Sequence, residues 1–193
     1  MSKRPRILIS SSVYDKQELL SQIYAVLEGI GYEVWMSDKG TLPINPKLTA
    51  FESCLNAVEE CDLFLGIISG HYGTGVSDGE NSITHQEFTK AIKLKKLRWF
   101  LINNDVLVVR QFVKAIKRYE ELSKNSVCSK LRLSQHDPIS DMRILTMYDE
   151  ATLADKPLSD RTGNWVQHYQ TNHDVLQFIK FQLGDPSKYE PVI

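Results

Sequence analysis

One uninterrupted apolar run constrains the fold of this chain more than any other feature. Residues 63–68 read LFLGII and contain no polar position. A strand of this kind is typical of a parallel sheet that helices cover on both faces, because both faces of the strand must then be buried. The rest of the chain is therefore expected to supply further parallel strands and the helices that connect them.

Other short apolar runs alternate with segments of helical periodicity. The predicted strands are residues 6–10, 32–36, 63–68, 97–102 and, as a short fifth strand, 143–147. The predicted helices are residues 15–30, a segment with Phe51, Cys54, Leu55 and Val58 on one face, and residues 85–96, 106–122 and 173–183, whereas 134–138 and 154–172 read as loops. Strands that alternate with helices form right-handed crossovers. We therefore expect an α/β three-layer sandwich of flavodoxin-like type, with a mainly parallel five-stranded sheet in the order 2-1-3-4-5 and helices on both faces.

Net charge and cysteine content limit the binding partners and the cellular compartment that can be expected for this chain. The formal net charge is -1, so neither a nucleic acid nor an acidic membrane is expected as a partner. Cys54, Cys61 and Cys128 are odd in number and lack the spacing of metal ligands, which fits a reducing compartment. The first apolar run, residues 7–9, is too short for a signal peptide or a membrane span. We expect a cytoplasmic protein whose 193 residues bury one sizeable core.

Several familiar catalytic sites are excluded because their motifs are missing. No Gly-Lys-Ser/Thr follows a strand, no Gly-x-Gly-x-x-Gly opens a helix, and no Gly-x-Ser-x-Gly elbow is present. Three serines, residues 10–12, stand where a phospho-receiver domain has its acidic cluster. The five histidines form no metal-ligand pattern, so no metal site is expected and we interpret them as scattered surface residues.

The predicted topology indicates where a ligand would bind. In an open parallel sheet, ligands lie beyond the carboxyl ends of the strands, near the point where the strand order reverses. This rule selects residues 10–15, 36–46, 69–82 with the helix start that follows, and 103–106. These segments are polar and rich in small residues, although surface loops often have that composition without any function.

Glu87 is the strongest single candidate in these segments. It lies near the start of the third predicted helix, and Thr84-x-x-Glu87 has the spacing of a capping box, in which the glutamate reaches back to the first turn. Alternatively, its carboxylate points into the cleft at the edge of the sheet. Chemistry at a glycosidic carbon needs such a carboxylate, as nucleophile or as stabiliser of positive charge. Spacing alone favours the capping box.

Motifs in the first half of the chain resemble those of an uncharacterised family of TIR-like domains. Ile9-Ser10-Ser11 with Asp15 is similar to its opening I-S-S-x-x-x-D, and residues 61–73 are similar to its C-D-x-F-x-G-I-x-G-x-Y-G. Ser82, Thr84 and Glu87 match S-x-T-x-x-E. The chain departs from the pattern at His71, where the family usually has Arg, and at His85, where it usually has an acid. The resemblance implies one TIR-like domain over residues 1–193, with a motif-bearing core at 6–102 and a variable half at 103–193 that completes the sheet.

The helix around Glu87 is similar to two further helices that bear a catalytic glutamate. One belongs to the NAD-cleaving TIR domains, and the other is the E-L-G-Y-A helix of nucleoside 2-deoxyribosyltransferases. Both families break an N-glycosidic bond next to a ribose-type sugar, so the resemblance makes Glu87 the expected catalytic residue. The deoxyribosyltransferases keep an aspartate six residues ahead of their nucleophile, where this chain has Asn81, and this departure weakens the expectation of deoxyribosyl transfer.

The resemblance implies an enzyme that cleaves NAD+ to an ADP-ribose or cyclic ADP-ribose-type product, with NAD+ as substrate and no further cofactor. It further implies bacterial antiviral defence and activation by assembly, as a homo-oligomer or through a partner protein. The expected substrate contacts are Ser10, Ser11, Tyr14, Asp15, Trp35, His71, Tyr72, Gly73 and Ser82. From the topology, Ser10, Ser11, Tyr72, Ser82 and Glu87 are expected to line one pocket. The alternatives are a non-enzymatic interaction or nucleotide-sensing module and, third, a hydrolase similar to the deoxyribosyltransferases.

Overall fold

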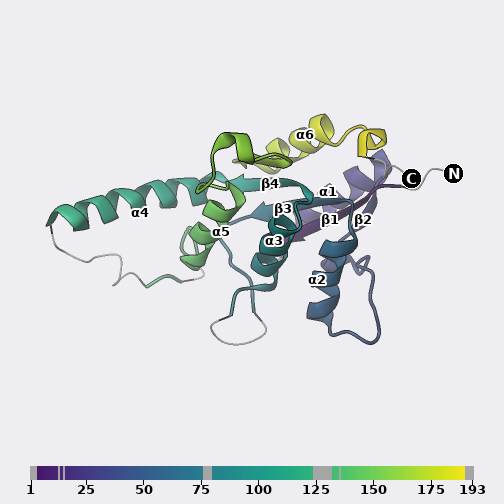
Figure 1. The fold of residues 1–193 in the computed structure, drawn as a ribbon, viewed down its shortest axis with the longest axis horizontal. Helices are drawn as coiled ribbons and strands as arrows, with labels where there is room; N and C mark the ends of the chain where they lie inside the picture. Colours follow the sequence, from purple (N-terminus) through teal and green to yellow (C-terminus); the bar gives the residue numbers. More distant parts are fainter. Residues whose placement is uncertain are drawn as a thin grey trace.

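A computed structural model describes residues 4–12, 14, 16–75, 80–123, 132–134 and 136–189 (Figure 1). The five strands are β1 (Arg6–Ser11), β2 (Glu33–Trp35), β3 (Leu63–Ile68), β4 (Leu97–Asn103) and β5 (Asn164–Tyr169). The α-helices are α1 (Gln17–Ile30), α2 (Ala50–Glu60), α3 (Ile83–Lys93), α4 (Asn104–Ser123), α5 (Arg143–Ala151) and α6 (Asn172–Gln182). Short 3-10 helices are η1 (Ser37–Lys39), η3 (Leu158–Asp160) and η4 (Pro186–Tyr189).

The strands form one sheet in the order β2-β1-β3-β4-β5, and every neighbouring pair is parallel. This arrangement confirms the predicted fold class. The central strand β3 is buried at all six positions, as its uninterrupted apolar sequence requires. The chain passes from β1 outward to β2 and then returns across β1 to β3. The strand order therefore reverses between β1 and β3, whose carboxyl ends flank the expected ligand crevice.

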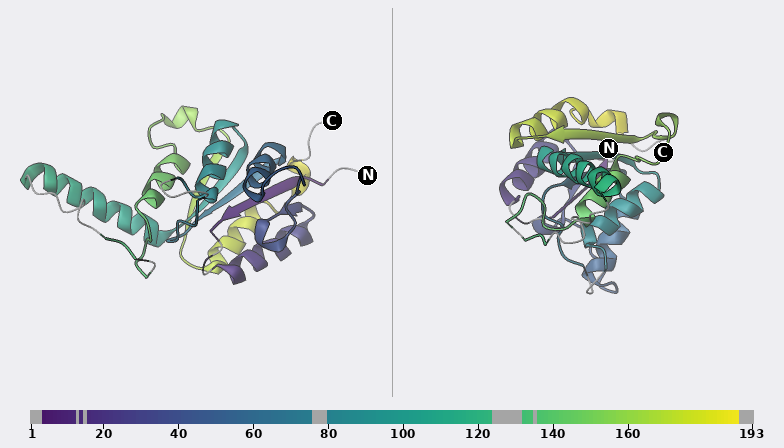
Figure 2. Two further views of the ribbon diagram at one scale, coloured as in Figure 1. Left: turned by 90° about the horizontal axis from the view of Figure 1, so that it is seen from below. Right: turned by 90° about the vertical axis from the view of Figure 1, so that its left-hand side faces the viewer.

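Helices cover both faces of the sheet and form the outer two layers (Figure 2). On one face, α1 and α6 pack over Ile7 and Ile9 of β1 and over the odd-numbered positions of β3 and β4. On the other face, α2, α3 and α5 pack over Leu8 of β1 and over the even-numbered positions of the same strands. The alternation follows from the pleat, because successive side chains of a strand point to opposite faces. Glu87 belongs to α3 and therefore lies on the second face.

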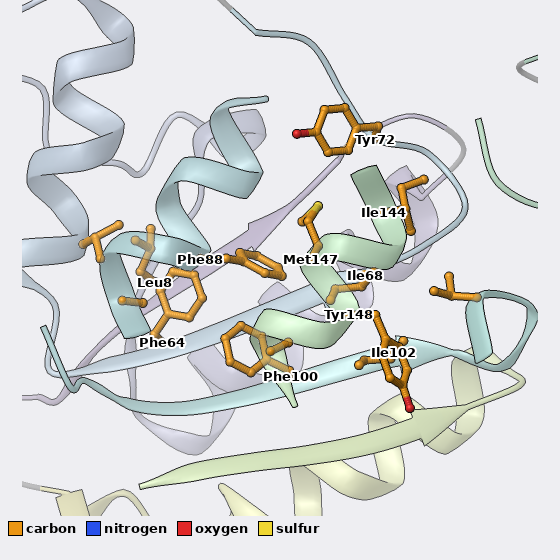
Figure 3. Close-up of a cluster of buried hydrophobic side chains, with 14 of the residues drawn as sticks. Leu8, Phe64, Ile68, Tyr72, Phe88, Phe100, Ile102, Ile144, Met147 and Tyr148 are labelled. Atoms are coloured by element: carbon orange, nitrogen blue, oxygen red, sulfur yellow. The ribbon is translucent and has the colours of Figure 1, made fainter. Parts of the chain in front are cut away.

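The core under α3 is built from three phenylalanine rings (Figure 3). Phe88 lies edge-on to Phe64, with 5.6 Å between ring centroids, and 5.0 Å from Phe100. Gly66 of β3 lies beneath these rings, and a Cβ atom added there would come within 2.7 Å of both Phe88 and Phe100. The absence of a side chain at this position lets α3 approach the sheet closely.

We expect Gly66→Ala to destabilise the fold by about 3 kcal/mol, because overpacking forces buried rings away from their preferred positions. Gly29→Ala is the matched control, since no heavy atom lies within 4 Å of the added Cβ on α1. The control should gain a few tenths of a kcal/mol to about 1 kcal/mol from helix propensity. Urea unfolding of both variants measures the difference. Equal stability of the two variants would contradict the described packing of α3.

The predicted fifth strand is wrong. Residues 143–147 form the first part of α5, whose buried residues recur at helical spacing as Ile144, Leu145, Met147, Tyr148 and Ala151. The five-residue window was too short to reveal this period. The actual strand, β5, lies within residues 154–172, which were predicted to be a loop. β5 is an edge strand with mostly half-buried or exposed positions, so its sequence NWVQHY carries little hydrophobic signal.

Helix α4 begins against the sheet and then extends away from it, as Figure 1 and the left-hand view of Figure 2 show. Val106 and Val113 are buried in the core, whereas Val108 and Phe112 are 61% and 62% exposed. None of the helices in the described part of the chain combines the length and hydropathy that a membrane span requires.

Candidate active site

A cavity of about 380 Å³ lies where β1 and β3 end, at the reversal of strand order. Three structural elements form most of it: the serine run that leaves β1, the loop that leaves β3, and the first turns of α3. The lining residues are Ile9, Ser10, Ser11, Ser12, Tyr14, Ser37, Cys54, Gly73, Thr74, Ile83, Thr84 and Glu87. Its volume is within the range of small-molecule sites.

Glu87 is the chemically distinctive residue of this cavity. Its side chain is buried, with 7% of the residue exposed, and the hydroxyl of Ser10 donates a hydrogen bond to its Oε2. Burial raises the pKa of Glu87 to about 7, because the charged form loses water, and the hydrogen bond from Ser10 opposes this effect. A carboxyl group with a pKa near neutrality exchanges its proton at physiological pH, as acid–base catalysis requires.

The capping box predicted for Thr84 and Glu87 is wrong. Helix α3 begins at Ile83, so Thr84 already lies within the first turn. The N-cap is Ser82, whose side chain accepts a hydrogen bond from the backbone N–H of His85, 3.2 Å away. The carboxylate of Glu87 contacts β1 instead of the helix start. A capping role therefore does not explain why the carboxylate of Glu87 is buried.

The cavity contains some of the predicted substrate contacts. Ser10, Ser11, Tyr14, Gly73 and Glu87 all line it, although they come from distant parts of the sequence. The ring of His71 lies beside that of Tyr14, with 4.4 Å between centroids. Asp15 lies outside the described residues.

Tyr72, Ser82 and Trp35 are not among the residues that line the cavity. Ser82 is fully buried as the cap of α3, and Tyr72 is 4% exposed with the guanidinium of Arg143 4.3 Å from its ring centroid. Trp35 is 5% exposed and packs in the core, with Arg6 over its ring. Neither Tyr72 nor Trp35, both expected as substrate contacts, therefore presents a ring face to this cavity.

Other residues of the site were missed. Ser12, Ser37, Cys54, Thr74 and Thr84 also line the cavity. Cys54 was placed only on one face of the second predicted helix. Burial, with a further contribution from the charge of Glu87, raises the pKa of its thiol to about 11. The run of three serines was a usable signal for Ser12, whereas the approach of α2 to α3 depends on packing and has no local signature.

His85 was interpreted as a surface histidine, and this interpretation is wrong. It is 1% exposed, and its ring bonds to Tyr72 and Glu150. The partner Glu150 lies 65 residues further along the chain. No local pattern indicates such a contact.

The cavity offers hydroxyl groups and one carboxyl group. Of the described residues that line it, only Glu87 is a carboxylic acid and none is Lys or Arg. The hydroxyls belong to Ser10, Ser11, Ser12, Tyr14, Ser37, Thr74 and Thr84. Such a lining suits a ligand rich in hydroxyl groups, such as a sugar, because hydroxyls both donate and accept hydrogen bonds. No cluster of three or more His, Cys, Asp or Glu suitable for a metal occurs within the described ranges.

A larger cavity, of about 740 Å³, lies between α2 and α3. Its lining includes Glu59 and Lys90, which form a salt bridge of 2.6 Å at the surface. Glu59 is more than half exposed, so its charge is solvated and poorly placed for catalysis. The smaller cavity, with its buried acid, is therefore the better candidate for an active site.

A family model and solved structures both match this chain. The family described as a domain of unknown function, DUF4062, matches residues 6–135. No curated protein matches this chain significantly. The solved structure of the CMP N-glycosidase BcmB from Clostridium botulinum is similar, with 16% identity and a TM-score of 0.45, over 91% of this chain and 98% of that one. Likeness of this degree does not transfer an activity.

Proposed function

This chain belongs to the family described as a domain of unknown function, DUF4062, and we propose that it is a nucleotide N-glycosidase whose preferred substrate is NAD+. The observation that carries the proposal is the buried carboxyl group of Glu87, with a pKa of about 7, in a hydroxyl-lined cavity at the reversal of strand order. Perturbed acids in clefts are frequent at functional sites. The resemblance of the motifs to NAD-cleaving TIR domains favours the same chemistry.

The proposed reaction breaks the bond between the ribose C1′ and the base nitrogen. The bonding electron pair leaves with the base, and positive charge develops on the ribosyl ring. The ionised carboxylate of Glu87 stabilises this charge, in a site where exclusion of water strengthens the interaction. A water molecule then adds to C1′ and loses a proton. Ser10 holds the carboxylate in position through its hydrogen bond to Oε2.

The single carboxyl group among the described lining residues favours NAD+ over other nucleotides. The nicotinamide of NAD+ is a cationic pyridinium, so it accepts the electron pair and leaves as a neutral molecule without protonation. Bases such as cytosine or adenine leave well only when an acid protonates them. Of the described lining residues, Glu87 alone is a carboxylic acid, so a second acid for this step is missing from the lining. A substrate whose leaving group departs without protonation therefore fits this site better.

Phosphates would lie against the main chain rather than against cationic side chains. We assign this contact to the backbone amides near Ser10 and Ser11 and to those of Gly73 and Thr74, which line the cavity together with the first turn of α3. In the loop, Gly73 adopts a φ of +80°, a conformation that favours glycine.

Assembly of several copies belongs to the proposal. Val108 and Phe112 lie four residues apart on one face of α4, and both are largely exposed. Because α4 extends away from the sheet, this face is accessible to a second copy or to a partner protein (Figure 1). An activity that depends on assembly, in antiviral defence, would follow the pattern that the TIR resemblance implies.

The same face of α4 favours a second candidate function, a non-enzymatic interaction module. In that case the Glu87 cavity would bind a nucleotide as a sensor without cleaving it, and α4 would contact the partner. The exposed Val108 and Phe112 are the observation in its favour.

Release of free base from a nucleotide panel distinguishes these functions. The purified chain is incubated with NAD+, nicotinamide mononucleotide, nicotinamide riboside and CMP at several protein concentrations, and products are separated by chromatography. We expect nicotinamide from NAD+, with a specific rate that rises with protein concentration, and little cytosine from CMP. Binding of NAD+ without base release would support the sensor instead. Cytosine release that outpaces nicotinamide release would overturn the choice of substrate.

A further inference from the structure

A chain of hydrogen bonds, buried at Tyr72 and His85 and partly exposed at Glu150, links the loop after β3 to α5. The hydroxyl of Tyr72 lies 2.6 Å from Nδ1 of His85, and Nε2 of His85 lies 3.2 Å from Oε2 of Glu150. The hydrogen bond from His85 holds the pKa of Glu150 below its usual value, so Glu150 is an ionised acceptor and Nε2 donates. Tyr72 and His85 are 4% and 1% exposed, so the links between them are shielded from water.

The main chain of the same loop is also held by the segment that leads into α5. The backbone N–H of Tyr72 donates to Oγ of Ser140 at 3.1 Å, and the N–H of Ser140 donates to the carbonyl of Gly70 at 2.7 Å. A Cβ atom at Gly70 would collide with the carbonyl oxygen of Pro138. Residues 138–150 therefore fix both the backbone and the side chain of Tyr72. These residues lie beyond the family match, which ends at residue 135.

Tyr72 is directly followed by two residues that line the Glu87 cavity, Gly73 and Thr74. We call this pair the loop wall. The carbonyl of Thr74 accepts a hydrogen bond of 3.1 Å from the N–H of Ile83, which places the wall against the start of α3. At its other end the wall continues into Tyr72, whose hydroxyl accepts a hydrogen bond from the N–H of Ser82 at 3.4 Å and lies 3.0 Å from Oδ1 of Asn81. A shift of the Tyr72 ring therefore moves the loop wall relative to Glu87.

We propose that Tyr72, His85 and Glu150 are positioning residues that hold the loop wall in its nucleotide-binding position, so that α5 controls substrate affinity. None of the three lines the cavity, so they act through the wall and make no contact with the reacting atoms. The part of this inference that concerns the nucleotide rests on the proposed function. The part that concerns the wall does not.

The chain offers a matched control for Tyr72 on the opposite side of α5. The hydroxyl of Tyr148 pairs with Nε2 of His168 at 3.1 Å, Arg110 lies 4.6 Å from its ring centroid, and the residue is 7% exposed. Tyr148→Phe thus removes a tyrosine–histidine hydrogen bond beside a guanidinium, as Tyr72→Phe does. Tyr72→Phe also removes the contacts of the hydroxyl with Oδ1 of Asn81 and the N–H of Ser82, both at the start of α3. Only Tyr72 is connected to the loop wall.

In turnover of NAD+, Tyr72→Phe is expected to raise KM roughly tenfold and to change kcat by no more than about threefold, because the wall contributes to binding and Glu87 to chemistry. Tyr148→Phe should leave both constants unchanged. Glu150→Leu should reproduce the Tyr72→Phe defect, and Glu150→Gln should rescue most of it, since the amide oxygen still accepts from His85. Equal effects of the two tyrosine variants, or a loss confined to kcat, would overturn the proposal.

Alkylation of Cys54 reports on the loop wall without any activity. Cys54 lines the cavity and is 9% exposed, whereas Cys61 is 1% exposed and serves as the internal reference. At fixed pH, iodoacetamide labelling read by peptide mass spectrometry should be several-fold faster at Cys54 in Tyr72→Phe than in the parent protein or Tyr148→Phe. An unchanged Cys54 rate in Tyr72→Phe would refute the positioning role. If the parent protein cleaves no nucleotide, the proposed function fails, and the labelling rates still decide the role of Tyr72.

Discussion

Glu87→Gln is expected to abolish base release from NAD+, with a loss of roughly a thousandfold or more, because a neutral amide no longer stabilises a developing ribosyl cation. The amide keeps the size of the side chain and still accepts the hydrogen bond from Ser10. The affinity for NAD+ should therefore change little. Initial rates and equilibrium binding, measured on the same preparation, separate the two effects.

The matched control for this loss is Glu52→Gln. Glu52 forms a true capping box with Thr49 at the start of α2 and is exposed. The chemical change is identical, but Glu52 does not line the cavity, so the control should retain activity. An equal loss in both variants would mean that the effect of Glu87→Gln comes from the fold. Retained activity in Glu87→Gln would remove Glu87 from the reaction.

Glu87→Gln is also expected to stabilise the protein at pH 8. The pKa of Glu87 is about 7 in the folded state, against 4.5 for the free side chain, so the folded protein binds this proton more tightly than the unfolded chain. Stability from this group is complete below pH 4.5 and is lost as the pH rises to about 7. At about 1.4 kcal/mol for each pH unit between the two values, burial of the charge costs about 3 kcal/mol at pH 8. Glutamine does not ionise and avoids this cost.

Denaturant unfolding at pH 4.5 and pH 8 measures the effect. The difference in unfolding free energy between Glu87→Gln and the parent protein should be small at pH 4.5 and favour the variant by about 3 kcal/mol at pH 8. Glu52→Gln should show the opposite trend, because hydrogen bonds from Thr49 hold the pKa of Glu52 below its usual value. A variant that is less stable at pH 8 would contradict the described burial of Glu87. The expected result would also exclude unfolding as the cause of lost activity.

The sequence predicted the first four strands and the sheet order because buried strands carry their own signal. β3 is apolar at every position, β4 is apolar at five of its seven positions, and β1 contains the apolar run Ile7–Ile9. The signal fades at the edge of the sheet, where β5 has one open side and keeps Trp165 and Gln167 exposed. The five residues at the start of α5 are apolar enough to resemble a strand when the turns after them are ignored.

The sequence predicted only part of the candidate site. Residues placed by local features were found, whereas residues placed by contacts distant in sequence were missed. Glu87, Ser10 and Ser11 follow from the topological rule and from motifs, because strand ends and helix starts are local features. The role of Ser82 as the cap of α3 was missed because Thr84 offered a competing local pattern. The burial of His85 depends on Glu150, and the lining by Cys54 depends on how α2 packs. Contacts of this kind are determined only by the assembled fold.

Nucleotide binding next to Glu87 can be measured through the NMR signal of its side-chain carboxyl carbon. Protein labelled with ¹³C at the glutamate carboxyl groups is titrated by NMR, and the Glu87 signal is identified by its absence from Glu87→Gln. We expect a midpoint near pH 7 in the free protein and a displaced midpoint when ADP-ribose, the product of NAD+ cleavage, is added. A midpoint near 4.5, or a titration that ADP-ribose leaves unchanged, would contradict the assignment of this cavity as a nucleotide-cleaving site.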